Sequence, residues 1–385
     1  MDAKVWITGL GAVTAGGWSA GETWSAVVNG ERFGQEIGRF PRFDAGSWAG
    51  APVLGMEAKA DPASHAVRFG VTAVEEAVAS AGLRSNDAVD VAVVATHGER
   101  TLPGPGHDPQ IGKAEDIANA VGNRVGARRT TSLYGACAGG ALAIGSAAKL
   151  VAAGHADIAV AGGCDGLLRE VDFFSFCSLY AMTARDCPPE EASCPFDSRR
   201  DGFLLGEGAA FVVLESEASL VRRDAEPLAS VEGFGYAQNA YHMVASPPDA
   251  VGPTLAIRRA LADARCDPSQ VQYINAHGTS TRDNDWCETL AIRKVFGPSA
   301  ENVSVSSVKG ALGHSMAAAG AVETVLCVQA LQDDVVPPTV NLREPDANCD
   351  LDYVPGEARD LSLRRVVNNS FGFGGHNAAM VLRGV

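Results

Sequence analysis

The sequence predicts an α/β layered fold, and two observations carry this prediction. Short apolar runs rich in β-forming residues alternate with helix-like segments over the whole chain, which is typical of sheets covered by helices. Many of the 43 glycines stand in short clusters beside small residues, which suits tight turns between strands and helices. With 385 residues, of which 46% are hydrophobic and 20% charged, the chain can bury two core units or one large α/β body.

The first half of the chain supplies one series of strands and helices. Its expected strands are Val5–Thr8, Val89–Thr96, Asp157–Gly163 and Ala209–Leu214, and its expected helices are Ala63–Ala81 and Ala138–Ala153. The second helix is rich in alanine and apolar on most sides, which indicates a helix buried in the core rather than one on the surface.

A second series of elements begins near Pro227. In chain order it comprises the strand Leu228–Tyr236, the helix Thr254–Ala264, the strand Val271–Asn275, the helix Asp285–Val295, the strand Val303–Ser306, the helix Ser315–Leu331 and the strands Arg364–Asn369 and Ala378–Leu382. The order is similar to that of the first half, although no sequence repeat is evident, and the charged stretch 215–226 suits a join. We therefore predict two units, residues 1–226 and residues 227–385.

The bulk composition excludes several classes of protein. The formal charge of −15 disfavours binding to nucleic acid or to an anionic membrane. The nine cysteines form no Cys-x-x-Cys pair, so neither a disulfide framework nor a zinc module is expected. No apolar run reaches the roughly 20 residues that span a bilayer, and the N-terminus carries no signal peptide. We expect a cytoplasmic protein with no membrane insertion and no metal site.

Cys137 differs from the other cysteines in its surroundings. A strand-like run ends near Ser132, a turn of small residues follows, and a helix begins just after Cys137. The positive end of the helix dipole favours a thiolate there, and the small neighbours leave the sulfur reachable. Cys137 is therefore a candidate nucleophile, with a buried structural cysteine as the alternative.

Two histidines and a lysine occupy comparable turns in the second half. His277 follows the strand Val271–Asn275, and Lys309 and His314 follow the strand Val303–Ser306. Functional groups gather at such strand ends in open α/β sheets. Taken alone, each histidine is better explained as a hydrogen-bonded structural residue, and neither has companions at a zinc-ligand spacing.

A glycine-rich loop at residues 368–377 sets Phe371 and Phe373 among three glycines, between two expected strands. Its backbone amides can point into a pocket, or the loop is a plain strand connection with packed phenylalanines. The earlier glycine motif at Gly9–Thr14 lacks the third glycine and the helix pattern of a dinucleotide fingerprint, so no NAD site is assigned.

Taken in this order, the motifs resemble the β-ketoacyl-acyl-carrier-protein synthase family, most closely its type II elongating members. The matching strings lie across nearly the whole chain, at Ile7–Thr14, Ala161–Gly163, Pro195–Asp197, Arg200–Phe203, Gly206–Gly208, Ala240–Met243, Asn275–Thr281, Gly313–His314 and Phe371–Gly375. One such string is weak evidence, whereas all of them in sequence order leave little room for chance agreement.

The resemblance implies a thiolase fold, in which two similar α/β halves form five layers in the order αβαβα, usually as a dimer. It also implies a catalytic triad of Cys137, His277 and His314, supported by the charge of Lys309. The N-terminal half then carries the nucleophile and the C-terminal half carries the histidines.

Further residues receive roles from the resemblance alone. Thr279 and Thr281 are implied to hold the phosphopantetheine arm, and Phe373 to act as a gate before the acyl pocket. The remaining implied residues are the loop members Phe371 and Gly374, which contact substrate, and the polar partners Glu323 and Asp285 behind the site.

The implied reaction is a decarboxylative Claisen condensation. Cys137 takes an acyl chain from a thioester and holds it covalently, and a malonyl group on acyl carrier protein then loses carbon dioxide. The enolate, stabilised by the two imidazoles, attacks the acyl group and gives a 3-oxoacyl chain two carbons longer. The amides of Cys137 and Phe373 are candidates for the oxyanion hole. No cofactor is expected beyond the phosphopantetheine arm of the carrier.

The surroundings of these residues depart from the usual family pattern. Glycine, alanine and leucine replace the hydroxyl residues that usually follow the nucleophile and the lysine, and His376 stands where threonine is usual. A docking arginine of elongating members aligns with Tyr180. The basic cluster before the first long helix is reduced to three residues, and two arginines remain as docking candidates: Lys59, His65 and Arg68, then Arg199 and Arg200.

These departures favour a specialised polyketide or polyene pathway over housekeeping fatty-acid elongation. The expected partners are an acyl carrier protein and a second subunit, either in a homodimer or in a heterodimer with a related ketosynthase or chain-length-factor subunit. Three rival hypotheses stay open: a non-catalytic chain-length partner, a cysteine hydrolase or plain acyltransferase, and a degradative thiolase.

Overall fold

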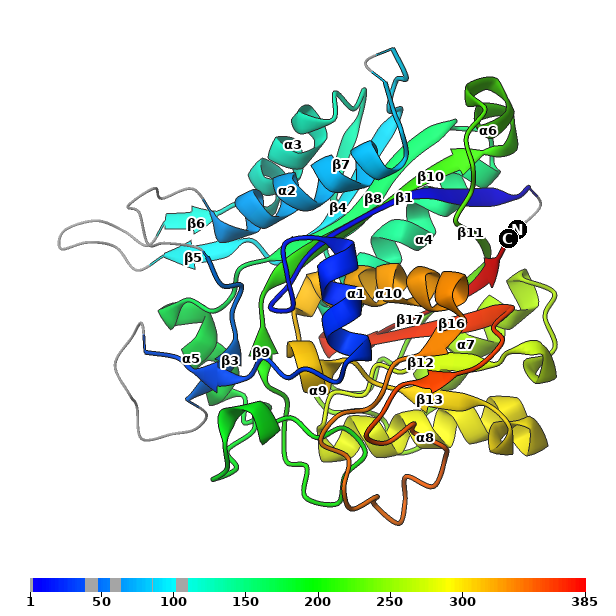
Figure 1. Ribbon diagram of the computed structural model, residues 1–385. Coiled ribbons are helices and arrows are strands. Elements are labelled where there is room, and N and C mark those ends of the chain that lie inside the picture. Colours follow the sequence, from blue (N-terminus) through cyan, green and yellow to red (C-terminus); the bar gives the residue numbers. More distant parts are fainter. Residues whose placement is uncertain (1–2, 39–47, 56–63, 85, 102–109) are drawn as a thin grey trace.

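The computed structural model describes residues 3–38, 48–55, 64–84, 86–101 and 110–385. The strands of its large sheet are β1 (Val5–Val13), β4 (Val91–Ala95), β7 (Thr130–Leu133), β8 (Ile158–Asp165), β10 (Gly208–Ser216), β11 (Ala229–Gln238), β12 (Tyr273–Asn275), β13 (Ser304–Ser306), β16 (Arg365–Gly372) and β17 (His376–Gly384). They lie side by side in the order β13-β12-β16-β17-β11-β1-β10-β8-β4-β7 (Figure 1).

The two halves of this sheet have the same topology. Each half contributes five strands, which can be numbered one to five along the chain. From the outer edge of the sheet to its centre, their order in both halves is three, two, four, five, one. The first three of these pair in parallel and the last two join in antiparallel, in both halves. The halves meet where β1 pairs with β11, with Val5 opposite Val231. The expectation of two similar halves is confirmed, whereas the division between residues 226 and 227 stays a prediction.

Helices cover both faces of each half. They are α1 (Ala20–Val28), α2 (His65–Ser80), α3 (Ala114–Arg124), α4 (Gly139–Ala152), α5 (Glu170–Ser178), α6 (Glu217–Arg223), α7 (Val251–Asp263), α8 (Arg282–Phe296), α9 (Lys309–Leu312) and α10 (Ala319–Asp333). Helices α2 and α3 pack on the outer face of the first half, and α7, with α8 beside it, packs on that of the second. Helices α4 and α10 lie between the halves, which gives the expected five layers.

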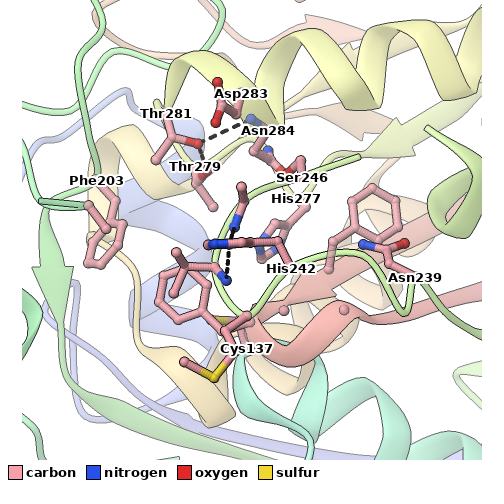
Figure 2. A pocket seen from close by; sticks show the side chains of 18 of the residues that line it. Cys137, Phe203, Asn239, His242, Ser246, His277, Thr279, Thr281, Asp283 and Asn284 are labelled. Atoms are coloured by element: carbon pink, nitrogen blue, oxygen red, sulfur yellow. Dashed lines mark hydrogen bonds between the residues drawn. The ribbon is translucent and has the colours of Figure 1, made fainter. Parts of the chain in front are cut away.

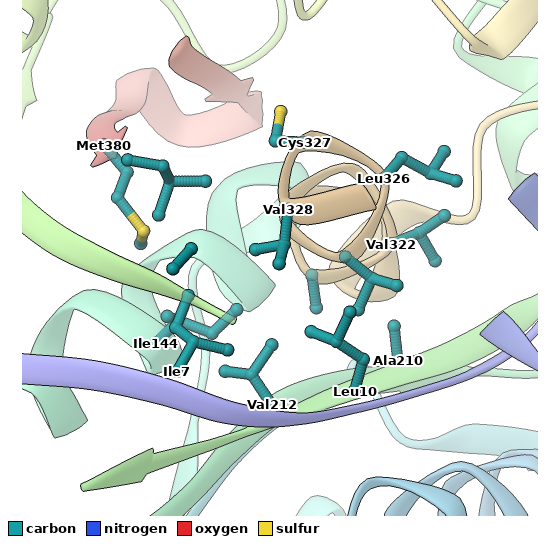
Figure 3. Packing of buried hydrophobic residues seen from close by; sticks show 14 of the residues in the cluster. Ile7, Leu10, Ile144, Ala210, Val212, Val322, Leu326, Cys327, Val328 and Met380 are labelled. Atoms are coloured by element: carbon teal, nitrogen blue, oxygen red, sulfur yellow. The ribbon is translucent and has the colours of Figure 1, made fainter. Parts of the chain in front are cut away.

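Helix α10 forms the centre of the core. Its side chains are buried on all sides, with Val322 and Leu326 among them (Figure 3). They pack against β1, β10, β17 and α4 in one cluster. Helices α4 and α10 approach closely because both carry glycine at the contact. A Cβ on Gly140 would lie 2.7 Å from the amide nitrogen of Ala321. The helix that follows Cys137 is thus packed closely against the second half.

Most of the expected elements exist, with shifted ends. The helix expected from Ser315 begins at Ala319, after a 3₁₀ turn at Met316–Ala318. Helices α1, α3, α5 and the short α9 were not predicted. No helix in the described ranges is long and apolar enough to cross a bilayer.

Candidate active site

Cys137 lies in a sharp turn between β7 and α4. The residue before it, Ala136, has φ +47°, a left-handed conformation that is costly for any residue other than glycine. A 3₁₀ turn at Ala136–Ala138 leads directly into α4. Strained turns of this kind present a side chain at the end of a sheet, and here the presented group is the thiol.

The Cys137 side chain is buried, with 4% of its surface exposed. Its Sγ lies 3.6 Å from the Sδ of Met316, within an apolar cluster that includes Phe203. Burial raises the pKa of the thiol to about 12, although the backbone N–H of Phe373 and the charge of Lys309 act in the opposite direction. Loss of hydration therefore opposes the thiolate that the helix dipole is expected to favour. The attacking thiol must lose its proton during the reaction.

This pKa predicts the pH dependence of alkylation. A thiol with a pKa of about 12 is protonated at neutral pH, and the thiolate fraction then grows about tenfold per pH unit. We expect the rate of Cys137 carbamidomethylation by iodoacetamide to rise continuously from pH 7 to pH 10, as measured by peptide mass spectrometry. A plateau beginning near pH 7 would show that the dipole prevails.

His277 follows β12 and is held through its backbone. The amides of His277 and Gly278 donate to the two carboxylate oxygens of Glu288 on α8, at 2.9 and 2.8 Å. Asn369 donates to the same carboxylate at 3.0 Å. Burial raises the pKa of Glu288 to about 7. This arrangement fixes the position of the imidazole without using its ring nitrogens.

His314 packs edge-on against His277, with ring centroids 5.3 Å apart. Both side chains are buried, and both imidazole pKa values lie well below the usual value, first because of burial and second because of the Lys309 charge. Within the described part of the chain, Nδ1 of His277 and both ring nitrogens of His314 have no hydrogen-bond partner. Two neutral rings with unused polar atoms are suited to a ligand oxygen.

Lys309 lies behind these rings, with 2% of its surface exposed. Its ammonium pairs with Glu323 of α10. Burial raises the pKa of Glu323 to about 7, and Lys309 opposes that shift. Glu323 is thus a polar partner of Lys309 behind the site, as expected. Asp285 is also buried, but it accepts from the amide of Phe196 and faces Arg200, so it anchors the neighbouring loop.

A pocket of about 290 Å³ opens onto these groups. Cys137 lies at one end of it, His277 in the middle, and Thr279 and Thr281 at the far end beside α8 (Figure 2). The two threonine hydroxyls lie 2.9 Å apart, and Thr281 also caps α8 by accepting from the amide of Asn284. The threonines therefore line a passage that leads to Cys137.

The glycine-rich loop forms another wall of the pocket. Phe371 and Phe373 line it, and the ring of Phe371 lies 5.8 Å from that of His277. Gly372 lies against the nucleophile, since a Cβ there would be 3.0 Å from the amide nitrogen of Cys137. Gly374 does not line the pocket; its amide donates to the carbonyl of Met243 at 2.6 Å.

The expected docking residues lie in different settings. Tyr180 is 88% exposed at the rim of the pocket. Arg200 is buried and bonds Asp346 at 2.7 Å, so the expectation that it remains a docking anchor is wrong.

The other basic candidates differ in their surroundings. Arg199 donates twice to Asp197. Arg68 is exposed beside the Trp18 ring, and Lys59 lies outside the described residues.

Several residues of the site were missed from the sequence. Asp165, at the end of β8, accepts from the amide of Ala317 at 2.7 Å and from the ring of His97 at 2.7 Å. It thereby anchors the turn that places Met316 against Cys137. The only sequence signal was that Asp165 lies two residues after the predicted strand Asp157–Gly163. Among the described residues, no group of three or more His, Cys, Asp or Glu side chains is arranged to hold a metal ion.

Comparisons with known proteins agree with this geometry. The β-ketoacyl synthase family matches with its N-terminal domain over residues 2–219 and with its C-terminal domain over residues 228–343. The 3-oxoacyl-[acyl-carrier-protein] synthase 2 of Coxiella burnetii is 37% identical over 408 residues, covering 98% of each chain. The actinorhodin polyketide putative β-ketoacyl synthase 1 of Streptomyces coelicolor is 36% identical over 424 residues, covering 100% of this chain and 89% of its own.

Solved structures show the same similarity over the full length. The ketosynthase complex AntDE:AntF, described as a type II polyketide synthase acyl-carrier protein with its ketosynthase, superposes with a TM-score of 0.90 at 32% identity, covering 100% of both chains. The ishigamide ketosynthase/chain length factor superposes with a TM-score of 0.88 at 31% identity, again covering 100% of both. A cysteine turn, two facing imidazoles and a buried lysine on this fold, together with these matches, place the chain in the β-ketoacyl synthase family.

Proposed function

We propose that this protein extends acyl chains by decarboxylative Claisen condensation in a specialised polyketide or polyene pathway. One observation carries the proposal: Cys137, His277 and His314, drawn from three distant stretches of chain, line one pocket with Lys309 behind them. The named roles follow from the chemistry that these groups can perform at their positions.

The first step transfers an acyl group to Cys137. The sulfur attacks the thioester carbonyl, and the S–H proton passes through a neutral imidazole to the departing pantetheine thiolate. The backbone N–H groups of Cys137 and Phe373 both stabilise negative charge on the Cys137 sulfur. They can therefore also donate to the oxyanion that forms beside it. The product is an acyl–Cys137 thioester and a free carrier thiol.

The second step forms the carbon–carbon bond. A malonyl thioester loses carbon dioxide, and the electron pair of the broken bond forms an enolate. The unused N–H groups of His277 and His314 donate to its oxygen, and the nearby Lys309 charge favours the negative state. The enolate carbon attacks the acyl carbon, the bond to Cys137 breaks, and the Cys137 thiolate takes up a proton from solvent. No electrons are gained or lost overall, so the reaction needs no redox cofactor.

The partners and the pathway belong to the same proposal. An acyl carrier protein would present both thioesters, and its contact surface would include the exposed Tyr180 at the rim. Two structural relatives are a carrier–ketosynthase complex and a ketosynthase/chain length factor, which supports a carrier and a heterodimer, with a homodimer as the alternative. The nine free cysteines suit the reducing cytoplasm. A role in fatty-acid elongation is the second candidate, favoured by the similarity to the Coxiella synthase.

The test is a reconstituted condensation. Purified protein is incubated with acyl carrier proteins loaded with a panel of acyl chains, followed by malonyl carrier protein. We expect an acyl adduct on Cys137 by intact-mass measurement, then a carrier-bound 3-oxoacyl product two carbons longer with one equivalent of carbon dioxide. Transfer of the acyl group without carbon dioxide release would instead support a plain acyltransferase.

A further inference from the structure

Three polar side chains near the glycine-rich loop form a continuous line of hydrogen bonds. Nδ1 of His376 lies 3.0 Å from the hydroxyl oxygen of Tyr236, and the Tyr236 hydroxyl donates to Oε1 of Gln238 at 2.6 Å. Nε2 of Gln238 then donates to the carbonyl of Gly374 at 2.7 Å. We refer to Tyr236, Gln238 and His376 as the brace.

The direction of each hydrogen bond in the brace is determined. The Gly374 carbonyl can only accept, so Gln238 must turn its NH₂ group toward Gly374 and its oxygen toward Tyr236. That oxygen can only accept the single phenol proton of Tyr236, so His376 must donate to Tyr236 through Nδ1–H. The brace therefore ends on a backbone carbonyl one residue after Phe373.

The brace holds the loop from one side while backbone contacts hold it from the other. The amide of Gly374 donates to the carbonyl of Met243, and the amide of Asn239 donates to the carbonyl of Gly375 at 2.9 Å. Gly374 and Gly375 both have positive φ, at +75° and +79°, so this backbone has an unusual conformation that depends on external contacts.

The position of this loop matters for Cys137. Gly372 packs directly on the amide of Cys137, and the amide of Phe373 stabilises negative charge on the Cys137 sulfur. The Phe373 N–H lies two peptide units before the Gly374 carbonyl, so a displacement of that carbonyl would shift the short loop backbone that carries this N–H. His277 and His314 are held by other elements, His277 through Glu288 and His314 through β9 (Leu205–Gly206) and its neighbours.

We propose that Tyr236, Gln238 and His376 are positioning residues for acyl transfer, because they hold the Gly374 carbonyl and thereby aim the Phe373 N–H at the reacting carbonyl oxygen. The proposal rests on the proposed function of the site. It separates two partial reactions: acyl transfer to Cys137 depends on the brace, whereas decarboxylation of malonyl thioester at the histidines does not.

The test measures the two partial reactions separately with small thioesters. Acylation of Cys137 by hexanoyl-pantetheine is followed by intact-mass measurement, and carbon dioxide release from malonyl-pantetheine is followed without an acyl donor. Gln238→Glu keeps the oxygen that accepts from Tyr236 but points a second oxygen at the Gly374 carbonyl. We expect acylation to fall about tenfold, and about three- to tenfold in Tyr236→Phe, with decarboxylation within twofold of the native rate.

Two further variants control the interpretation. His376→Asn retains an N–H donor near the position of Nδ1 and should keep at least half of the acylation rate, whereas His376→Val should resemble Tyr236→Phe. Gln332→Glu, at an exposed position near the end of α10, introduces the same charge away from the loop and should match the native protein.

An equal loss of both partial reactions would overturn the proposal, because it would indicate general disruption of the site. Unchanged acylation in Gln238→Glu and Tyr236→Phe would overturn it as well. If the native protein itself neither acylates Cys137 nor releases carbon dioxide, the proposed function fails instead, so the two failures are distinguishable.

Discussion

Replacing Cys137 by alanine should lower condensation at least a thousandfold, on the order of what removal of a catalytic nucleophile costs other enzymes. The acyl chain then has no covalent attachment point, because neither the backbone amide of residue 137 nor that of Phe373 can replace the sulfur as nucleophile. Product formation from acyl and malonyl carrier proteins, measured by mass spectrometry of the carrier, checks this result.

The same variant should still decarboxylate malonyl thioester. The sulfur takes no part in breaking the bond to carbon dioxide, and His277, His314 and Lys309 keep their positions because they are held by Glu288, by strand contacts and by Glu323. Cys266→Ala is the matched control, since Cys266 lies near the end of α7, away from the pocket residues. That variant should condense at the native rate.

The outcome discriminates among the rival hypotheses. A non-catalytic chain-length partner would show no dependence on Cys137, so full activity of Cys137→Ala in a reconstituted complex would contradict the proposal. A cysteine hydrolase would lose all activity when the thiol is removed. It would release no carbon dioxide either as the native protein or as Cys137→Ala. Only a condensing enzyme loses condensation and keeps decarboxylation.

The fold class was predictable because each half repeats strong local patterns. Apolar strand runs such as 209–214 and the alanine-rich helix after Cys137 are local features, and local features determine element type. The order of strands across the sheet was not predictable, because it depends on which apolar faces pack together over long distances. Recognition of the family supplied that arrangement, and the topology confirms it.

The fine geometry of the site escaped prediction for a related reason. Met316 was expected in the long helix, yet its φ is +49° and the helix begins three residues later. That conformation is held by a tertiary bond from Ala317 to Asp165, which no local pattern encodes. The effect of burial on the pKa of Cys137 was missed likewise, because a dipole argument uses neighbours in sequence whereas burial depends on the whole fold.

Replacing His314 by phenylalanine should abolish decarboxylation and leave the fold at least as stable. Phenylalanine is larger than histidine, but it keeps a buried aromatic ring beside the pocket and carries no N–H group for the enolate oxygen. Loss of one such donor commonly costs about a hundred- to a thousandfold in rate. Carbon dioxide release from malonyl-pantetheine measures this loss, and intact-mass measurement should show that hexanoyl transfer to Cys137 stays within a few-fold of native.

The stability of His314→Phe tests whether the ring nitrogens of His314 are buried without a structural partner. Both ring nitrogens of His314 are buried without a partner in the described residues, and each such group costs about 1–3 kcal/mol of desolvation. An apolar ring removes that cost, so the free energy of unfolding in urea should stay equal or rise, with Phe203 still packed against the ring edge. His314→Ala is the contrasting variant, since it removes the same donors but leaves a cavity and should be destabilised by about 2–4 kcal/mol. If His314→Phe were strongly destabilised while His314→Ala were not, the nitrogens would have structural partners rather than being held ready for substrate.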